Sequence, residues 1–300
     1  MNSVNIAKNI APKTNKKHYS ASFYTIKVIV LFIILFVAFL MLFPYLYMLS
    51  MSFKSGNEVV NNLAFYLFPK EFTLSNYVDI FTIIPLARGF INTLIIEAFV
   101  ISFGTLSTTM AAFAFARLRF RGKNFLFYMV LTTMMVPYIT VLTPQFSAFS
   151  HLGLVDTLYP LILPGLFGNV SMMFFLRQYA LSIPDSVYEA AEVDGCGFFR
   201  LYWNIFLPLV RPAIAAQVIF WFLGIWNDVF GPDIYLQTLN NKTIQVMIKY
   251  LDNQTGSGTL KNLPTIMAGS VLSSIPTIAI YVVFQKYFVN TFMLSSSKDN

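Results

Sequence analysis

The sequence predicts an all-α integral membrane protein with six transmembrane helices. Hydrophobic residues make up 57% of the 300 positions and charged residues only 11%, whereas a soluble domain carries about 25% charged residues. The mean hydropathy is +0.66. Several apolar runs reach the ~20 residues that a helix needs to cross a bilayer. Because lipid cannot satisfy backbone hydrogen bonds, runs of this length are expected to be helices.

The first apolar run covers Val28–Leu49, which is 22 residues without a charge. Lysines precede it, as they would in a secretory signal peptide. A signal peptide, however, has an apolar core of about 7–15 residues that ends at a small-residue cleavage site. This run is longer and leads into Ser50–Lys54. We therefore predict a helix that is retained in the membrane.

Five further apolar runs follow, and they contain two carboxylates in all, Glu97 in the second span and Asp228 near the outer end of the fifth. The runs are Gly89–Ala116, Phe125–Phe149, Thr157–Leu176, Pro212–Pro232 and Leu263–Phe284. Prolines are frequent in the third and fourth spans, at positions 137, 144, 160 and 164. Because each proline removes a backbone donor and favours a kink, we expect these two spans to be bent around a pathway.

The distribution of basic residues predicts the orientation. With the N-terminus inside, the inner segments hold 14 of the 20 Lys and Arg residues. These inner segments are 1–27, 117–123, 177–211 and 285–300, and the outer ones are 50–88, 150–156 and 233–262. Cytoplasmic loops are enriched in Lys and Arg, so both termini are expected in the cytoplasm.

This orientation gives a simple domain organisation. Residues 1–27 form a cytoplasmic N-terminal segment, 28–285 the six-helix transmembrane domain, and 286–300 a short cytoplasmic tail.

No metal site or other cofactor is expected, because Cys196, His18 and His151 have no metal-ligand spacing. No basic recognition helix suggests nucleic-acid binding. The phosphate-binding pattern G-x-x-x-x-G-K-[ST] does not occur, so any ATPase is expected on another polypeptide.

The inner segment 177–211 carries the most specific pattern. Pro184 suits the first turn of a helix, and Asp194-Gly195 supplies a stop, since glycine adopts the left-handed cap conformation. We expect a second short helix over Phe198–Phe206, ended by Pro208. Such a pair of helices can project from the membrane as a docking knob. The alternative is an amphipathic helix that lies on the inner membrane surface.

The small side chains Ala190 and Ala191 would permit close contact between this knob and another protein. The pattern Glu189-Ala190-Ala191-x-x-Asp194-Gly195, followed by Ile205-x-Leu207-Pro208 and Pro212, resembles the EAA loop of binding-protein-dependent ABC importers. The spacing from Gly195 to Leu207-Pro208 also agrees with that family.

Other segments resemble the second, shorter permease subunit of the maltose-type carbohydrate branch. The likeness covers roughly residues 28–290, and the tail Asn290–Asn300 departs from the glycine-rich ending that is usual in the family. The segments that carry it are Pro44–Lys54, Phe72–Tyr77, Phe90–Thr93, Ala111–Arg117, Leu163–Gly165 and Trp226–Asp228.

This resemblance implies a type I ABC importer permease fold in the bacterial cytoplasmic membrane and no catalytic residue. It also implies a second permease subunit, a cytoplasmic ATPase dimer, an extracytoplasmic solute-binding protein and a sugar substrate. The residues expected to couple the permease to the ATPase are Glu189, Ala190, Ala191, Asp194, Gly195, Leu207 and Pro208.

Polar side chains within or beside the spans are the candidates for a substrate pathway. Uncharged polar groups with aromatic neighbours suit a neutral hydroxylated solute, although the sugar assignment rests mainly on the resemblance. The pathway candidates are Asn92, Glu97, Asn169, Asn227 and Asp228.

Three alternative functions remain open at this point. An ABC permease for amino acids, phosphate or peptides would share the EAA loop. An ion-coupled secondary transporter would need carboxylates near the membrane midplane, where Glu97 alone is available. A membrane scaffold without a transport role would leave the docking motif unexplained.

Overall fold

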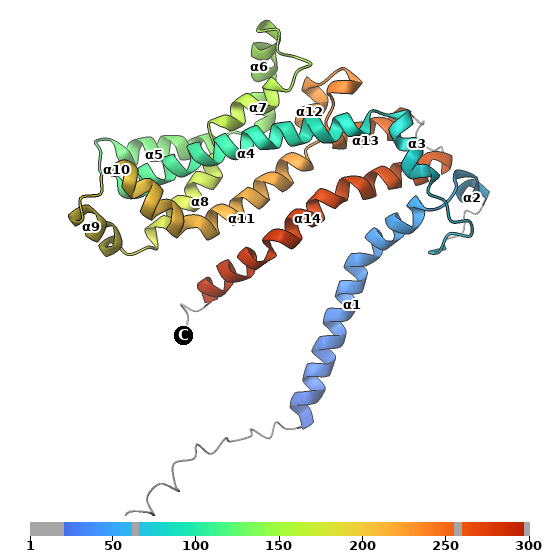
Figure 1. The fold of residues 1–300 in the computed structure, drawn as a ribbon, viewed down its shortest axis with the longest axis horizontal. Coiled ribbons are helices and arrows are strands. Elements are labelled where there is room, and N and C mark those ends of the chain that lie inside the picture. Colours follow the sequence, from blue (N-terminus) through green and yellow to red (C-terminus); the bar gives the residue numbers. More distant parts are fainter. Residues whose placement is uncertain (1–20, 62–65, 255–259, 297–300) are drawn as a thin grey trace, which may run out of the picture. The chain divides into compact units, whose positions relative to one another are not determined.

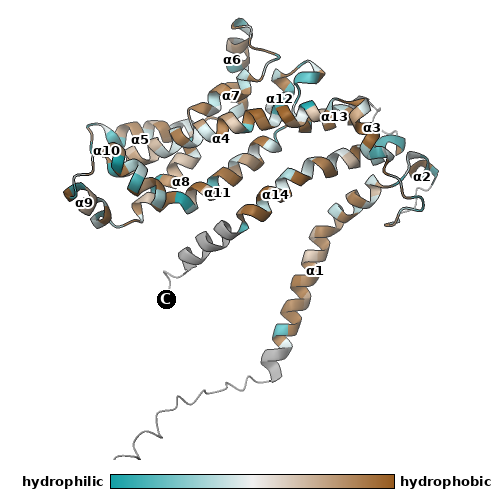
Figure 2. Cartoon of the chain, in the orientation of Figure 1, coloured by the Kyte–Doolittle hydropathy of each residue, from teal (hydrophilic) through white to brown (hydrophobic). Residues whose placement is uncertain are grey.

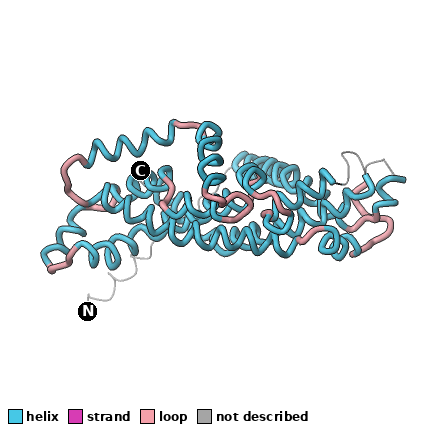
Figure 3. The backbone as a smooth tube through the Cα atoms, turned by 90° about the horizontal axis from the view of Figure 1, so that it is seen from above, coloured by secondary structure: helices cyan, strands magenta, loops and turns pink. Residues whose placement is uncertain are grey.

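The computed structural model describes residues 21–61, 66–254 and 260–296, and every regular element in these ranges is helical (Figure 3). The chain divides into two compact units, residues 1–47 and residues 48–300. The first unit contains most of helix α1 (Ala21–Ser52), which includes Pro44 and begins seven residues before the predicted span. Hydrophobic residues dominate α1 along its length (Figure 2).

The second unit is built around α4 (Leu86–Arg117), α11 (Leu207–Trp226) and α14 (Leu263–Ser296). Helix α11 packs against both α4 and α14, while α7 (Tyr159–Leu166) and α8 (Val170–Leu181) pack on α4 (Figure 1). Short helices join and cover these elements. They are α2 (Gly56–Asn61), α3 (Ser75–Ile83), α12 (Phe230–Tyr235), η3 (Leu239–Asn241), α13 (Ile244–Gln254) and η4 (Leu260–Asn262).

Helices α4 and α7 approach closely where Gly104 faces Gly165, and Trp221 of α11 packs against the same place. A Cβ atom at Gly104 would lie 2.4 Å from the carbonyl oxygen of Gly165 and 2.3 Å from the ring of Trp221. Small residues permit such backbone contacts between membrane helices. Gly104 and Gly165 therefore allow α4 and α7 to pack closely.

Among the described residues, five helices, continuous or in adjoining pieces, are long and apolar enough to cross a membrane, and a bent pair makes a sixth if it is counted as one span. The bent pair joins α5 and η1 (Lys123–Thr132 and Thr133–Met135) to α6 (Tyr138–His151) at an angle of 93°. The third predicted span is therefore not one straight helix. Pro137 explains the break, because it disfavours helical backbone at Val136, whose ψ is 118°.

The fourth predicted span, 157–176, is interrupted and is shifted toward the C-terminus, from Tyr159 to Leu181. Helices α7 and α8 are separated at Phe167–Asn169. Gly168 has a φ of +97°, which glycine adopts without a steric penalty. Asn169 then caps α8, because its side-chain oxygen accepts a hydrogen bond from the backbone N–H of Met172 at 3.1 Å.

The predicted bounds of the fifth span, 212–232, are wrong. The helix runs without interruption from Phe198 to Trp226, through α10 (Phe198–Arg200), a π-helical stretch η2 (Leu201–Phe206) and α11. Pro208 does not end it, because a proline in the first turn of α11 costs little and the wide π turn precedes it. The helix stops at Trp226, and Asp228 lies in the break before α12.

Candidate functional site

Helix α9 (Asp185–Val193) lies between the end of the span that contains α8 and the start of the next span at α10 (Figure 1). It begins directly after Pro184, with Asp185 in its first turn. Gly195 has a φ of +80°, and its N–H donates to the carbonyl of Glu192 at 3.0 Å. The N–H of Cys196 donates to the carbonyl of Ala191 at 3.0 Å. The helix stop predicted from Asp194-Gly195 is confirmed, and these bonds satisfy carbonyls at the helix end.

The two faces of α9 have different surroundings. Tyr188 and Ala191, three residues apart, are buried in a cluster with Leu201, Tyr202 and other apolar residues of α4, α8 and α11. The opposite face is open. The exposed residues are Glu189, Ala190, Glu192 and Val193 of α9, together with Asp194 and Gly195 directly after it.

The seven residues expected at the coupling contact therefore do not share one surface. Glu189, Ala190, Asp194 and Gly195 are exposed together. Ala191 was expected to allow contact with another protein, but its side chain is 7% exposed and packs in the core of its own chain. Leu207 and Pro208 are half-buried at the start of α11, so they lie in the fifth span and not on α9.

A cavity of about 310 Å³ opens between α8 and α11, and Asn169, Ser171 and Gln217 contribute its polar lining. Gln217 is 7% exposed, and its side-chain amide donates to the carbonyl of Met172 at 2.5 Å. The cavity lies at the broken part of the fourth span, where the first turn of α8 supplies backbone N–H groups without partners in the helix. A site of this kind offers donors and acceptors but no formal charge.

Among the five pathway candidates, only Asn169 lines this cavity. Asn92 donates to the carbonyls of Asn240 and Lys242 at 2.9 and 3.0 Å and so ties α4 to the segment before α13. Glu97 is 3% exposed, and its carboxylate oxygens have no hydrogen-bond partner among the described residues. The remaining two follow α11. Asn227 donates to the carbonyl of Leu223, and Asp228 accepts from the backbone N–H of Phe230.

Two relationships between distant residues were not predicted from the sequence. Gln217 joins Asn169 at the cavity across 48 positions, and no local pattern indicates that pairing. Asp156 accepts hydrogen bonds from the backbone N–H groups of Gln237 and Thr238, both at 2.8 Å. Its position between Gly153 and the next span is typical of a turn, and this was the available signal.

The geometry defines a class of protein: a multi-pass helical membrane protein with broken spans, a polar cavity beside one break, and a short capped helix outside the spans. Residues 104–292 match the model of the family described as binding-protein-dependent transport system inner membrane component. The chain belongs to this family.

Curated relatives cover most of the chain. It is 32% identical over 256 residues to the arabinooligosaccharides transport system permease protein AraQ of Halalkalibacterium halodurans, covering 85% of this chain and 90% of the relative. It is 30% identical over 246 residues to the diacetylchitobiose uptake system permease protein NgcG of Streptomyces coelicolor, covering 81% and 80%.

Solved structures share the fold. One is a chain of a bacterial ABC transporter involved in the import of the acidic polysaccharide alginate, with a TM-score of 0.76 and 25% identity, covering 90% of this chain and 99% of that one. A second alginate transporter structure, in complex with a pentasaccharide-bound periplasmic protein, matches with a TM-score of 0.61 at 16% identity. The latter supports the fold alone.

Proposed function

We propose that this chain is one of two permease subunits in a bacterial ABC importer and forms half of the translocation pathway for a sugar or oligosaccharide. The observation that carries the proposal is the exposed surface of α9 and the turn that ends it, where Glu189, Ala190 and Gly195 are open to a partner in a member of the binding-protein-dependent family. The relatives named for arabinooligosaccharides and diacetylchitobiose support a saccharide as the solute.

In this proposal α9 docks on a separate cytoplasmic ATPase dimer. Ala190 lets the two backbones approach closely, and the carboxylates of Glu189 and Asp194 offer acceptors to cationic or N–H groups of the ATPase. Closure of the ATPase dimer on ATP moves α9, and the spans reorient. The permease itself has no catalytic residue, and ATP hydrolysis belongs to the partner.

The cavity beside Asn169 and Gln217 is this subunit's contribution to the pathway. Amide side chains both donate and accept hydrogen bonds, which matches the hydroxyl groups of a saccharide. Since a buried charge would bind one solute strongly and hinder its release, an uncharged lining suits transport. The second permease subunit, a different polypeptide in this proposal, supplies the facing half.

The orientation places α9 in the cytoplasm. The partition of 14 of the 20 basic residues to the inner segments supports this assignment. A solute-binding protein then captures the saccharide outside and docks on the outer segments 50–88 and 233–262. Membrane lipid surrounds the spans.

The deciding measurement compares two kinds of liposome. One contains this chain alone, and the other contains this chain with its partner permease, ATPase, ATP and binding protein. The probes are radiolabelled arabinotriose and diacetylchitobiose, and non-hydrolysable ATP serves as the control. We expect concentrative uptake only in the complete, ATP-supplied liposomes.

Each alternative gives a different result. Uptake driven by an ion gradient in liposomes with this chain alone would establish a secondary transporter. ATP-dependent uptake of an amino acid, phosphate or peptide, with no uptake of either saccharide, would keep the importer and reject the sugar.

A further inference from the structure

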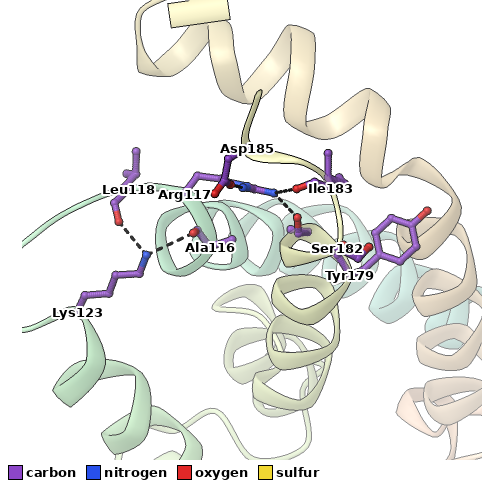
Figure 4. Close-up of polar contacts among 9 residues, drawn as sticks. Ala116, Arg117, Leu118, Lys123, Tyr179, Ser182, Ile183 and Asp185 are labelled. Atoms are coloured by element: carbon purple, nitrogen blue, oxygen red, sulfur yellow. Dashed lines mark hydrogen bonds and ion pairs between the residues drawn. The ribbon is translucent and has the colours of Figure 1, made fainter. Parts of the chain in front are cut away.

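Arg117 is the last residue of α4, and its side chain lies between α4 and the start of α9 (Figure 4). The side chain is 7% exposed. Its guanidinium donates to the carbonyl of Ile183 at 2.8 Å and to the carbonyl of Ala180. It also forms an ion pair with Asp185. The guanidinium carbon lies 3.9 Å from the centre of the Tyr188 ring.

These contacts join three helices through one side chain. Ala180 lies in the last turn of α8, where its carbonyl also accepts the backbone N–H of Ile183 at 3.1 Å, and Ile183 belongs to the linker after the helix. A cation at a helix C-terminus satisfies such carbonyls and interacts favourably with the helix dipole. Asp185 and Tyr188 belong to α9. Arg117 therefore connects α4 to α8 and to α9.

The contacts of Arg117 differ in strength. The side chain of Asp185 is 80% exposed, so water and salt screen its ion pair. The bonds to the carbonyls and the stacking on Tyr188, which is 4% exposed, are shielded from solvent. These shielded contacts need the planar, forked guanidinium, which a lysine ammonium cannot reproduce.

The backbone on either side of Arg117 is held by a second basic residue. Lys123, at the start of α5, donates to the carbonyls of Leu118 and Ala116 at 2.9 and 3.4 Å (Figure 4). These two carbonyls flank Arg117 at the end of α4. The connection from α4 to α9 is therefore short and held at both ends.

We propose that Arg117 is the positioning residue that transmits the movement of α9 to the spans α4 and α8. The proposal rests on the proposed function of α9 as the contact with the ATPase. Arg117 touches neither the solute nor ATP, and it acts through α9. When the ATPase displaces α9, the guanidinium carries α4 and α8 with it because its shielded carbonyl and ring contacts hold the three helices together.

The test uses the complete importer in liposomes with arabinotriose as the probe. The variants are Arg117→Lys and Asp185→Asn, with Arg119→Lys as a matched control on the same loop, where the side chain is exposed. Two rates are measured, ATP hydrolysis and uptake, together with the amount of ATPase that co-purifies. Modification of Cys196 by maleimide in the purified importer reports whether α9 has left its place, since Cys196 packs beside the α9 cluster.

For Arg117→Lys we expect the ATP hydrolysed per solute moved to rise at least about fivefold, with the ATPase still bound, because shielded charge-assisted bonds are lost. Maleimide should modify Cys196 faster. Asp185→Asn should raise the ratio less than about twofold, and Arg119→Lys should leave it unchanged.

A merely structural role predicts another pattern. Uptake and hydrolysis would then fall in proportion in Arg117→Lys, with an unchanged ratio, and this result would overturn the proposal. An unchanged ratio with wild-type rates would overturn it as well. Absence of ATP-dependent uptake in the wild-type importer would instead count against the proposed function, and the maleimide rate of Cys196 would still report on the contact between Arg117 and α9.

Discussion

Asp156 and Thr238, which are 82 residues apart, are joined by two hydrogen bonds. The Asp156 carboxylate accepts from the backbone N–H of Thr238 at 2.8 Å and from its hydroxyl group. The N–H of Asp156 donates to the carbonyl of Tyr235 at 2.8 Å, and its φ is +62°. This pair holds the connection before α7 to the segment between α12 and η3. It fixes the shape of a surface that in our proposal faces the binding protein.

Replacement of Asp156 should release this segment. Asp156→Ala removes the acceptor and leaves a residue that tolerates positive φ poorly, so we expect a loss of about 1–2 kcal/mol in unfolding free energy. Asp156→Asn keeps one acceptor oxygen and tolerates the left-handed conformation, so its effect should be smaller. Hydrogen exchange at the amides of Gln237 and Thr238 measures both. Equal protection in Asp156→Ala and wild type would contradict the assignment.

The same carboxylate gives a pH dependence with a definite sign. Partial burial alone would raise the pKa of Asp156, but hydrogen bonds from Thr238, Gln237 and Asn241 outweigh it and hold the pKa below its ordinary value. A depressed pKa in the folded state stabilises the fold above the unfolded value of about 3.9, and this contribution disappears as the pH falls through the folded pKa. Protection of the Thr238 amide should persist at pH 5 and decrease only below about pH 4. Asp156→Asn should show no such step.

Gly104 and Gly224 form a matched pair for testing helix packing. Gly104→Ala places a methyl group 2.4 Å from the Gly165 carbonyl, so the helices have to separate, at a cost of about 1–3 kcal/mol. Nothing lies within 4 Å of a Cβ at Gly224, which is exposed inside α11. Gly224→Ala should therefore be neutral or stabilise by up to about 1 kcal/mol. Thermal unfolding of the two purified variants in detergent tests this, and equal midpoints would refute the packing argument.

Substitutions at Gly195 test the effect of backbone strain without a steric clash. Nothing lies within 4 Å of a Cβ there, so only the φ of +80° opposes a side chain. Gly195→Asn should keep coupled transport, Gly195→Ala should weaken it, and Gly195→Val should be worst, because β-branched residues tolerate positive φ least. Uptake is measured together with ATPase co-purification. Wild-type uptake by the valine variant would remove Gly195 from the coupling contact.

The predicted orientation can be read from single cysteines in a Cys196→Ala background. Val60 and Phe120 are 46% and 40% exposed, so cysteines at both positions are open to reagents. An impermeant maleimide added to whole cells should label position 60 and leave position 120 unmodified until the membrane is opened. Labelling of position 120 in intact cells would invert the topology. Position 255, also expected outside, lies beyond the described residues.

The transmembrane spans and helix α9 depend on features of the local sequence, and this is why the sequence predicts them. The length of an apolar run decides whether a helix can cross lipid, and Gly195 ends α9 wherever the rest of the chain lies. The 93° bend at Pro137 does not follow in the same way, because proline favours a kink but packing against neighbours determines its size. Likewise, hydropathy continues past Trp226, whereas the helix stops there.

The candidate site, too, could be predicted from the sequence only in part. The motif predicts that α9 is a contact element, but helical periodicity places Ala191 on the same side as Tyr188, and that side is buried. Arg117 and the α8 carbonyls lie more than 60 positions apart. No spacing within the sequence indicates that they meet. The pairing of Asn169 with Gln217 has the same origin in the tertiary fold.

The break in the fourth span bears on how the pathway excludes cations. Asn169 lies midway along the span Tyr159–Leu181, and the amide end of α8 opens there onto the cavity, with no cationic or anionic side chain in its lining. The amide end of a helix carries about half a positive elementary charge, and in a medium of low dielectric constant this potential repels hydronium and sodium ions. A saccharide carries no charge and does not meet this barrier. In our proposal, the backbone N–H groups that donate to the hydroxyl oxygens of a saccharide also oppose the entry of cations at this point of the pathway.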